Sequence, residues 1–200
     1  MAVAVSKVDI CNRALVALGD KSRRITSLTG SVTPLAQVFI DNWDECRDKT
    51  IARYDWPCMR KVDELTVSDD DPTITKWVYK YARPSDCVIF RKVIDEGGVQ
   101  YEHKEMTEDT TQWIYSNLAD AFAVYSFNND DPDTYSVGFR QLMIAHLTAA
   151  VALYVTSDPE IARLMELKLT QISERKAQAA DAVETYVEMP QGEDTWLKDY

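Results

Sequence analysis

The sequence predicts a mixed α+β protein, a four-helix body carrying an inserted antiparallel β-rich unit. Residues 33–57 repeat apolar side chains at helical spacing, whereas residues 59–127 alternate them with a period of two. After NNDDPD at 128–133 the helical pattern returns. The predicted boundaries are 1–57 and 128–186 for the helical body, which has two N-terminal and two C-terminal helices, 58–127 for the β-rich unit, and 187–200 for a C-terminal arm.

The first helix is predicted over residues 6–19. Ser6 with Asp9 three residues later resembles a capping box, in which each residue bonds the other's backbone amide. Gly19 suits the left-handed position that follows a helix end.

Residues 33–57 predict one long amphipathic helix. Thr33 can cap its first turn, and Pro34 suits the first helical position, where no amide hydrogen is needed. Pro57 disfavours the helical conformation at Trp56, so the helix should end near there. The apolar face consists of Leu35, Ala36, Phe39, Ile40, Trp43, Cys46, Ile51 and Tyr54.

The β-rich unit is expected to contain five to seven antiparallel strands. Residues 76–81 alternate with three aromatic rings on one face, and residues 87–94 are predominantly apolar. Gly97–Gly98 predicts a hairpin turn, and the strand that returns from it runs through residues 99–103. Residues 113–115 and 121–127 supply further strands.

Two helices are predicted after the insertion. Residues 134–156 are apolar nearly all round, which is typical of a central helix covered on several sides. After a turn at 157–159, an apolar stripe predicts a last helix from Ile161 to about Thr185.

The composition limits the classes of function that the chain can have. With 200 residues, of which 46% are hydrophobic, the chain can bury a core. The net charge of −11 argues against wrapping DNA, because phosphate binding requires a basic surface, although DNA can still pass nearby without adhering. The N-terminus lacks the pattern of a secretory signal, and the most apolar run, 142–155, is interrupted and short for a bilayer. We expect no membrane association and folding in a reducing cytoplasm.

No catalytic or metal-binding motif appears in the sequence, so we expect neither an enzyme nor a cofactor. His146 lies in the most apolar helix and is interpreted as a buried, satisfied core histidine, whereas His103 is interpreted as a solvated strand residue. Residues 69–71 and 128–131 are rich in Asp and Asn, but each segment is followed by a proline, and turn chemistry explains them better than a calcium site. The cysteines, Cys11, Cys46, Cys58 and Cys87, lack zinc spacing. Cys11 and Cys46 lie beside apolar residues on helical faces, so buried free thiols are expected there in preference to a disulfide.

Two features point to surfaces that bind partners. The basic loop with Lys21, Arg23 and Arg24 has two interpretations: it forms one side of a charge-complementary contact, or it is simply solvated. The large apolar residues at the end of the acidic tail are anchors that a partner would bury, unless the tail serves no contact. These anchors are Trp196, Leu197 and Tyr200.

Three segments carry a resemblance to a known family. ICNRALVALG at 10–19, ITSL at 25–28 and the helix ending ARYDWP at 52–57 resemble the tail tubular protein A family, the head-to-tail adaptors of T7-like short-tailed bacteriophages. The β insertion, with WVYKYARPSDCV at 77–88, and the late helices fall in the expected order. These are packing motifs and not catalytic ones.

The resemblance implies a structural protein of the virion tail, assembled in the host cytoplasm. Such adaptors form a dodecameric ring between the portal protein and the tail nozzle protein, support tail fibres and leave a channel through which genomic DNA passes without specific binding. Two alternatives stay open on the residues alone. The acidic pairs and aromatic residues suit a tail-associated polysaccharide or cell-wall hydrolase, and the terminal arm suits a soluble module that binds a host protein.

Overall fold

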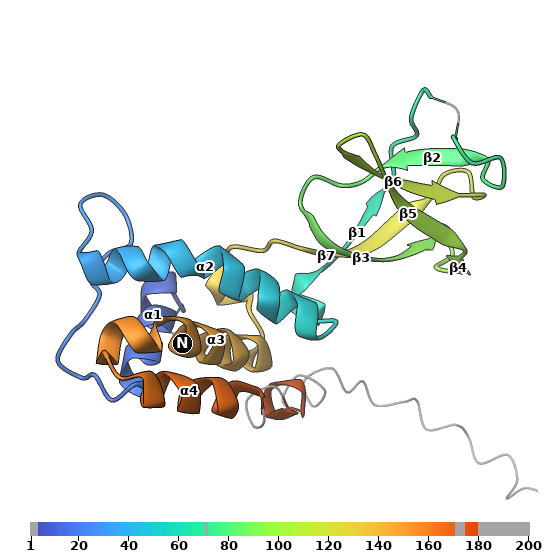
Figure 1. The fold of residues 1–200 in the computed structure, drawn as a ribbon. Coiled ribbons are helices and arrows are strands. Elements are labelled where there is room, and N and C mark those ends of the chain that lie inside the picture. Colours follow the sequence, from blue (N-terminus) through green and yellow to red (C-terminus); the bar gives the residue numbers. More distant parts are fainter. Residues whose placement is uncertain (1–3, 71, 171–174, 180–200) are drawn as a thin grey trace, which may run out of the picture.

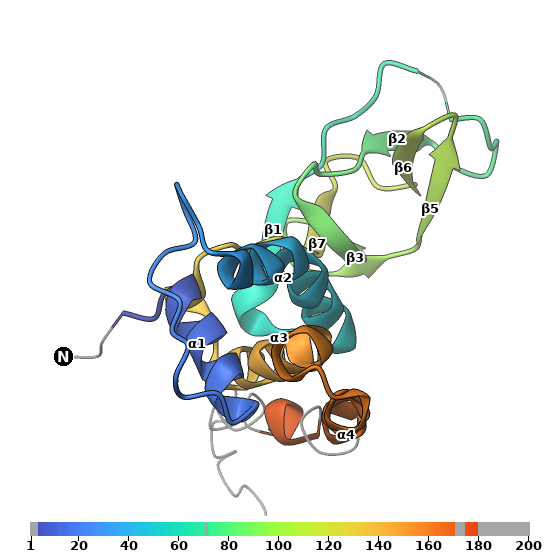
Figure 2. The same cartoon turned by 60° about the vertical axis from the view of Figure 1, so that its left-hand side comes forward.

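The computed structural model describes residues 4–70, 72–170 and 175–179 and confirms the mixed α+β class. Figure 1 shows a helical lobe and a β lobe, and the view in Figure 2 keeps them apart. Each lobe has its own cluster of buried apolar residues.

The helical lobe is organised around one central helix. Its helices are α1 (Lys7–Ala17), α2 (Pro34–Arg53), α3 (Val137–Thr156) and α4 (Pro159–Lys168). The helix α3 packs against each of the other three. Its buried side chains include Phe139, Leu142 and Met143, which join Ile10 and Leu15 of α1 in the core.

The predicted caps of the first two helices are confirmed. Ser6 and Asp9 form a reciprocal capping box at the start of α1, and Gly19 adopts a φ of +84° after its end. The Thr33 hydroxyl accepts a hydrogen bond from the amide of Ala36 at 3.2 Å. These caps satisfy amides that would otherwise lack partners at the first turn.

The second helix ends earlier than predicted. Arg53 is its last residue, Tyr54 is extended, and Pro57–Met59 form a short 3-10 turn. The Trp56 side chain turns back, is fully buried, and donates from Nε1 to the Thr50 carbonyl at 2.8 Å. The ring thereby satisfies a carbonyl near the helix end and fills the core beneath it.

The β lobe contains seven strands, within the predicted number, arranged as two antiparallel sheets. One sheet has the order β1-β7-β3-β4 and the other β2-β6-β5. The strands are β1 (Arg60–Glu64), β2 (Tyr79–Ala82), β3 (Cys87–Ile94), β4 (Gln100–Tyr101), β5 (His103–Glu108), β6 (Thr111–Ser116) and β7 (Phe122–Phe127). Because β1 pairs with β7, the two ends of the insertion lie side by side.

Two details of the β-rich unit differ from the predictions. The alternating stretch 76–81 is a strand only from Tyr79, and Lys80, which lies between two of the aromatic residues, is 6% exposed. The separate strand β5 was not anticipated. It pairs with β6 through a turn at which Asp109 has a φ of +53°.

The late helices also differ from their predicted limits. The helix α3 starts at Val137, after a short 3-10 turn at Pro132–Thr134. It is not covered all round, since Leu153 and Tyr154 near its end are 56% and 50% exposed. The helix α4 ends at Lys168. Helical residues return at 175–179, and the rest of the predicted extension to Thr185 lies outside the described residues.

By length and composition, α3 would suffice to cross a membrane. The helix is longer than the apolar run 142–155 and extends beyond it at both ends, and the expectation of no membrane association stays a prediction. Half of its most apolar window is buried, and core helices pass the same test.

The lobes meet where α2 ends. Val88 and Ile89 of β3 pack against the helical core. Arg91, also in β3, donates from Nη2 to the Tyr54 carbonyl at 3.2 Å and to Ser126 Oγ of β7 at 3.1 Å. One side chain therefore ties the end of α2 to the middle of the larger sheet.

Candidate interaction surface

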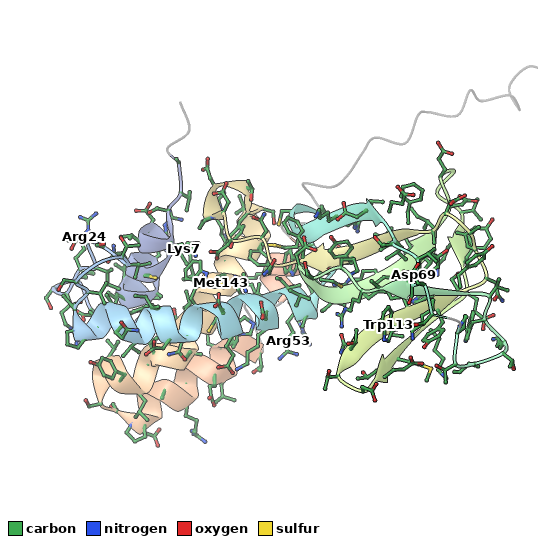
Figure 3. All side chains as sticks on the ribbon, turned by 90° about the horizontal axis from the view of Figure 1, so that it is seen from above. Lys7, Arg24, Arg53, Asp69, Trp113 and Met143 are labelled. Carbon is green, nitrogen blue, oxygen red and sulfur yellow. The ribbon has the colours of Figure 1, made fainter. Side chains whose placement is uncertain are left out.

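A basic hollow of about 420 Å³ lies between α1 and the loop that follows it. Its cations are Arg13 from α1 and Lys21, Arg23 and Arg24 from the loop. Figure 3 shows Arg24 at the end of the helical lobe that is furthest from the β lobe. The three predicted basic residues are thus brought together with a fourth, Arg13, on the neighbouring helix.

Asn12 fixes the loop against α1. Its side chain donates to the Ile25 carbonyl and accepts from the Ile25 amide, both at 2.9 Å. The Ile25 side chain is buried in the helical core, so the backbone next to Arg24 is held from two directions. Hydrogen bonds from Ser6 are the main cause of the lowered pKa of the Asp9 carboxyl. The positive charges of Arg13 and Arg24 lie close enough to lower this pKa a little further.

Arg23 is held by contacts within the helical lobe. Its guanidinium forms an ion pair with Asp20 and donates from Nη2 to the Val155 carbonyl near the end of α3 at 2.8 Å. Asp20 also accepts from the amides of Ser22 and Arg23 at 3.1 Å, and such bonds hold its pKa down at about 2. Arg23 fastens the loop to α3, and within the described residues its charge already has a partner.

Arg13, Lys21 and Arg24 are exposed, and no hydrogen bond or ion pair to another described residue holds their charged groups. Arg13 was not among the predicted residues. A signal was present in the sequence, because Arg13 follows Asp9 by four residues and so lies on the same helix face. The other predicted contact residues, Trp196, Leu197 and Tyr200, lie outside the described residues.

A pair of carboxylates lies at the larger sheet, where it shares a tyrosine and a lysine. The Tyr125 hydroxyl lies 2.6 Å from Asp63 Oδ2 and 2.8 Å from Asp86 Oδ1. Lys61 Nζ lies 2.7 Å and 3.1 Å from the same two carboxyl groups. Hydrogen bonds from Lys61 and Tyr125 lower the pKa of Asp63, and they lower that of Asp86 despite its desolvation.

A second polar cluster lies on the smaller sheet. Glu108 accepts from Lys80 at 2.7 Å, from Thr73 at 2.6 Å and from the Tyr115 hydroxyl. These bonds lower the pKa of Glu108 to about 2. Lys80 Nζ also lies 4.3 Å from the centroid of the Trp113 ring. The cluster fastens the loop containing Thr73 to Glu108 at the end of β5, which also bonds side chains of β2 and β6.

A glycosidase needs a carboxyl group that is protonated near neutral pH, which requires a raised pKa. Among the described carboxyl groups, each one with a resolved shift has a lowered pKa. In both β-lobe clusters the carboxylates accept bonds from lysine and tyrosine and are held ionised.

The Asn- and Asp-rich segment 128–131 makes structural contacts. Asp130 forms ion pairs with Lys7 of α1 and with Arg47 of α2, and accepts from Trp43 Nε1 at 3.2 Å. Asp131 accepts from the Asp133 amide at 3.2 Å, as expected of a turn. Within the described part of the chain, no three His, Cys, Asp or Glu residues are grouped as metal ligands.

His146 is buried, as predicted. The prediction that its hydrogen-bonding groups are all satisfied is wrong. Nε2 has no hydrogen-bond partner among the described residues, and burial lowers the pKa of the ring to about 4. His103 is half-buried, with its ring 5.1 Å from that of Phe90, and not fully solvated. None of the four cysteines forms a disulfide with another described residue, and Cys11 and Cys46 are buried as expected. Burial raises the pKa of Cys11 to about 12 and that of Cys46 to about 11.

No protein-family model and no curated protein matches this chain.

Proposed function

We propose that this protein is a structural adaptor of a short-tailed bacteriophage virion, similar to the tail tubular protein A family. Copies of it form a ring between the portal and the tail nozzle and leave a channel for the genome. The ring is dodecameric in this proposal and also supports the tail fibres.

The observation that carries the proposal is the position of the segments that resemble that family. Residues 10–19 form most of α1, and residues 52–57 form the joint at the end of α2. Ile10, Leu15 and Trp56 from these segments lie in one helical core. The resemblance therefore falls on the residues that set the shape of the subunit, as a structural role requires.

The two-lobed subunit supports the same role. The helical body builds the ring wall, and the β lobe, which extends from it, makes contacts with neighbouring tail components. The acidic net charge of −11 disfavours adhesion of passing DNA, since like charges repel.

The hydrolase alternative is weakened by the β-lobe clusters described above. Their carboxylates have lowered pKa values and bond lysine and tyrosine, so they are poorly suited to protonate a leaving group. A glycan-degradation assay tests this directly. Turnover by the purified protein that is abolished by Asp63→Asn or Glu108→Gln would overturn the adaptor proposal.

Electron microscopy of the protein mixed with its candidate portal tests the adaptor proposal itself. The expected result is a closed ring capping the portal, with the protein alone as control. A protein that stays monomeric with an intact portal ring present would contradict the proposal.

A further inference from the structure

The basic hollow carries positive charge that the described residues do not neutralise. Of its two carboxyl groups, Asp20 is bonded to Arg23, Ser22 and the loop backbone, and Asp9 to Ser6. The charges of Arg13, Lys21 and Arg24 remain available on a protein whose net charge is −11. A surface of this kind favours a negatively charged partner.

The hollow also offers apolar contact. Val16, which is 56% exposed, lies among its lining residues, and the arginine side chains add aliphatic stems and flat guanidinium groups. Guanidinium groups stack on aromatic rings as well as pairing with carboxylates. A volume of about 420 Å³ suits one or two large side chains better than a whole helix. The matching partner is therefore a short acidic segment that carries an aromatic or aliphatic anchor.

This chain contains such a segment. Residues 187–200 include four acidic residues and one lysine, and they contain the three large apolar residues Trp196, Leu197 and Tyr200. The acidic residues of the segment are Glu188, Glu193, Asp194 and Asp199. The arm therefore combines the charge and the anchors that the hollow lacks.

We propose that the arm of one copy, residues 187–200, docks in the basic hollow of a second copy and links neighbouring subunits. The hollow lies at the outer end of the helical lobe, away from the β lobe, where a neighbour can reach it (Figure 3). The proposal rests on the adaptor function only in expecting copies of the chain to meet side by side. A nucleic acid is the less favoured occupant, because the strongly acidic remainder of the protein repels it.

A fluorescent peptide of residues 187–200, added to the full-length protein and followed by anisotropy, tests the contact. We expect saturable binding that weakens as salt is raised, because exposed charges are screened. The double variant Arg13→Glu/Arg24→Glu should bind the peptide at least about tenfold more weakly, which corresponds to the loss of about 1.4 kcal/mol. The matched control is Lys104→Glu/Arg163→Glu, which makes the same change of charge at exposed sites that do not line the hollow and should bind as the wild type does.

Charge exchange separates a specific contact from general attraction. A peptide with Glu193→Lys and Asp194→Lys should regain affinity for the Arg13→Glu/Arg24→Glu protein and lose it for the wild type. Equal binding by both double variants, or no peptide binding at all, would overturn the proposal. Binding of a labelled DNA duplex in place of the peptide, lost in the same variant, would also overturn it.

Imaging of the double variant with the portal distinguishes this inference from the adaptor function. If rings form normally on the portal but the wild-type protein does not bind the peptide, the proposed arm contact is overturned and the adaptor function is not. Peptide binding without any ring would instead count against the adaptor.

Discussion

Among the described residues, most buried polar side chains bond a nearby backbone carbonyl or an opposite charge, whereas one buried nitrogen of His146 and one of Arg83 have no hydrogen-bond partner. Thr50 and Thr148 donate to carbonyls one turn earlier, both at 2.7 Å, and Arg47 pairs with three carboxylates. His146 instead lies between α2 and α4, near Lys49, Arg53, Cys46 and Glu166, with Nε2 unpartnered in the described structure.

This environment predicts a loss of stability in acid. The folded-state pKa of His146, about 4, lies below its unfolded value of 6.5, so the unfolded chain binds the proton more readily. The contribution is present above about pH 6.5 and is lost as the pH falls toward 4. Between about pH 7 and pH 5 it amounts to about 2 kcal/mol of unfolding free energy.

Urea denaturation of the wild type and of His146→Leu at both pH values measures this effect. The variant should lose about 2 kcal/mol less on acidification, and it should be no less stable at neutral pH, because an unpaired buried group is removed. His103→Gln controls for loss of an imidazole as such. Identical pH dependence in the wild type and His146→Leu would show that His146 is not the responsible group.

A second prediction at this scale concerns the Tyr125 hydroxyl, which bridges Asp63 and Asp86. Tyr125→Phe leaves two neighbouring carboxylates with only Lys61 between them, and we expect a loss of about 1–3 kcal/mol by chemical denaturation. Tyr101→Phe is the matched control, since among the described residues its exposed hydroxyl bonds a single carboxylate, Asp95, and it should change stability by less than about 0.5 kcal/mol. Equal effects of both substitutions would mean that the bridge adds nothing.

At the scale of elements, the end of α2 depends on one buried aromatic side chain. Trp56 is fully buried and makes edge-on contacts with Tyr54 and Phe139, at centroid distances of 5.1 and 5.5 Å. Trp56→Ala should therefore cost about 3–5 kcal/mol through lost burial and a cavity. Trp56→Phe keeps a ring but loses the bond to Thr50, so its loss should be clearly smaller. Thermal and urea unfolding compare the stabilities of the two variants. If Trp56→Ala left the free energy of unfolding almost unchanged, the buried ring would not stabilise the end of α2.

The same element shows which features the sequence could predict. The caps at Ser6, Thr33 and Gly19 were predictable because each depends on residues within one turn. The early end at Arg53 was not, since Trp56 folds back to bond Thr50 and bury itself against α3. The two separate sheets and β5 were missed because strand pairing joins residues far apart in the chain, which local alternation does not specify.

At the scale of the whole molecule, the charges of the sequence predicted which loop residues belong to the candidate site, but not how their side chains are arranged. Lys21, Arg23 and Arg24 stand out in an acidic sequence, yet only the fold separates their roles. Asn12 and Ile25 direct Arg24 toward Arg13, whereas Arg23 turns to Asp20 and α3. No local pattern reveals that Arg23 reaches a carbonyl 132 residues away.

The orientation of the two lobes gives a last prediction. Arg91 bonds Tyr54 and Ser126 and lies 3.7 Å from Asp55, so it connects the helical lobe to the larger sheet. Arg91→Met should cost about 1–3 kcal/mol and broaden the distance distribution in small-angle X-ray scattering, because the lobes can then rotate about the joint. Arg83→Met is the control, because Arg83 bonds the Val88 carbonyl within the same lobe. If Arg91→Met lowers stability but leaves the scattering unchanged, the arginine stabilises the sheet without setting the lobe orientation.

If the adaptor proposal holds, a loosened joint should also lower the yield of rings on the portal, since a closed ring requires every subunit to present its contacts at the same angle.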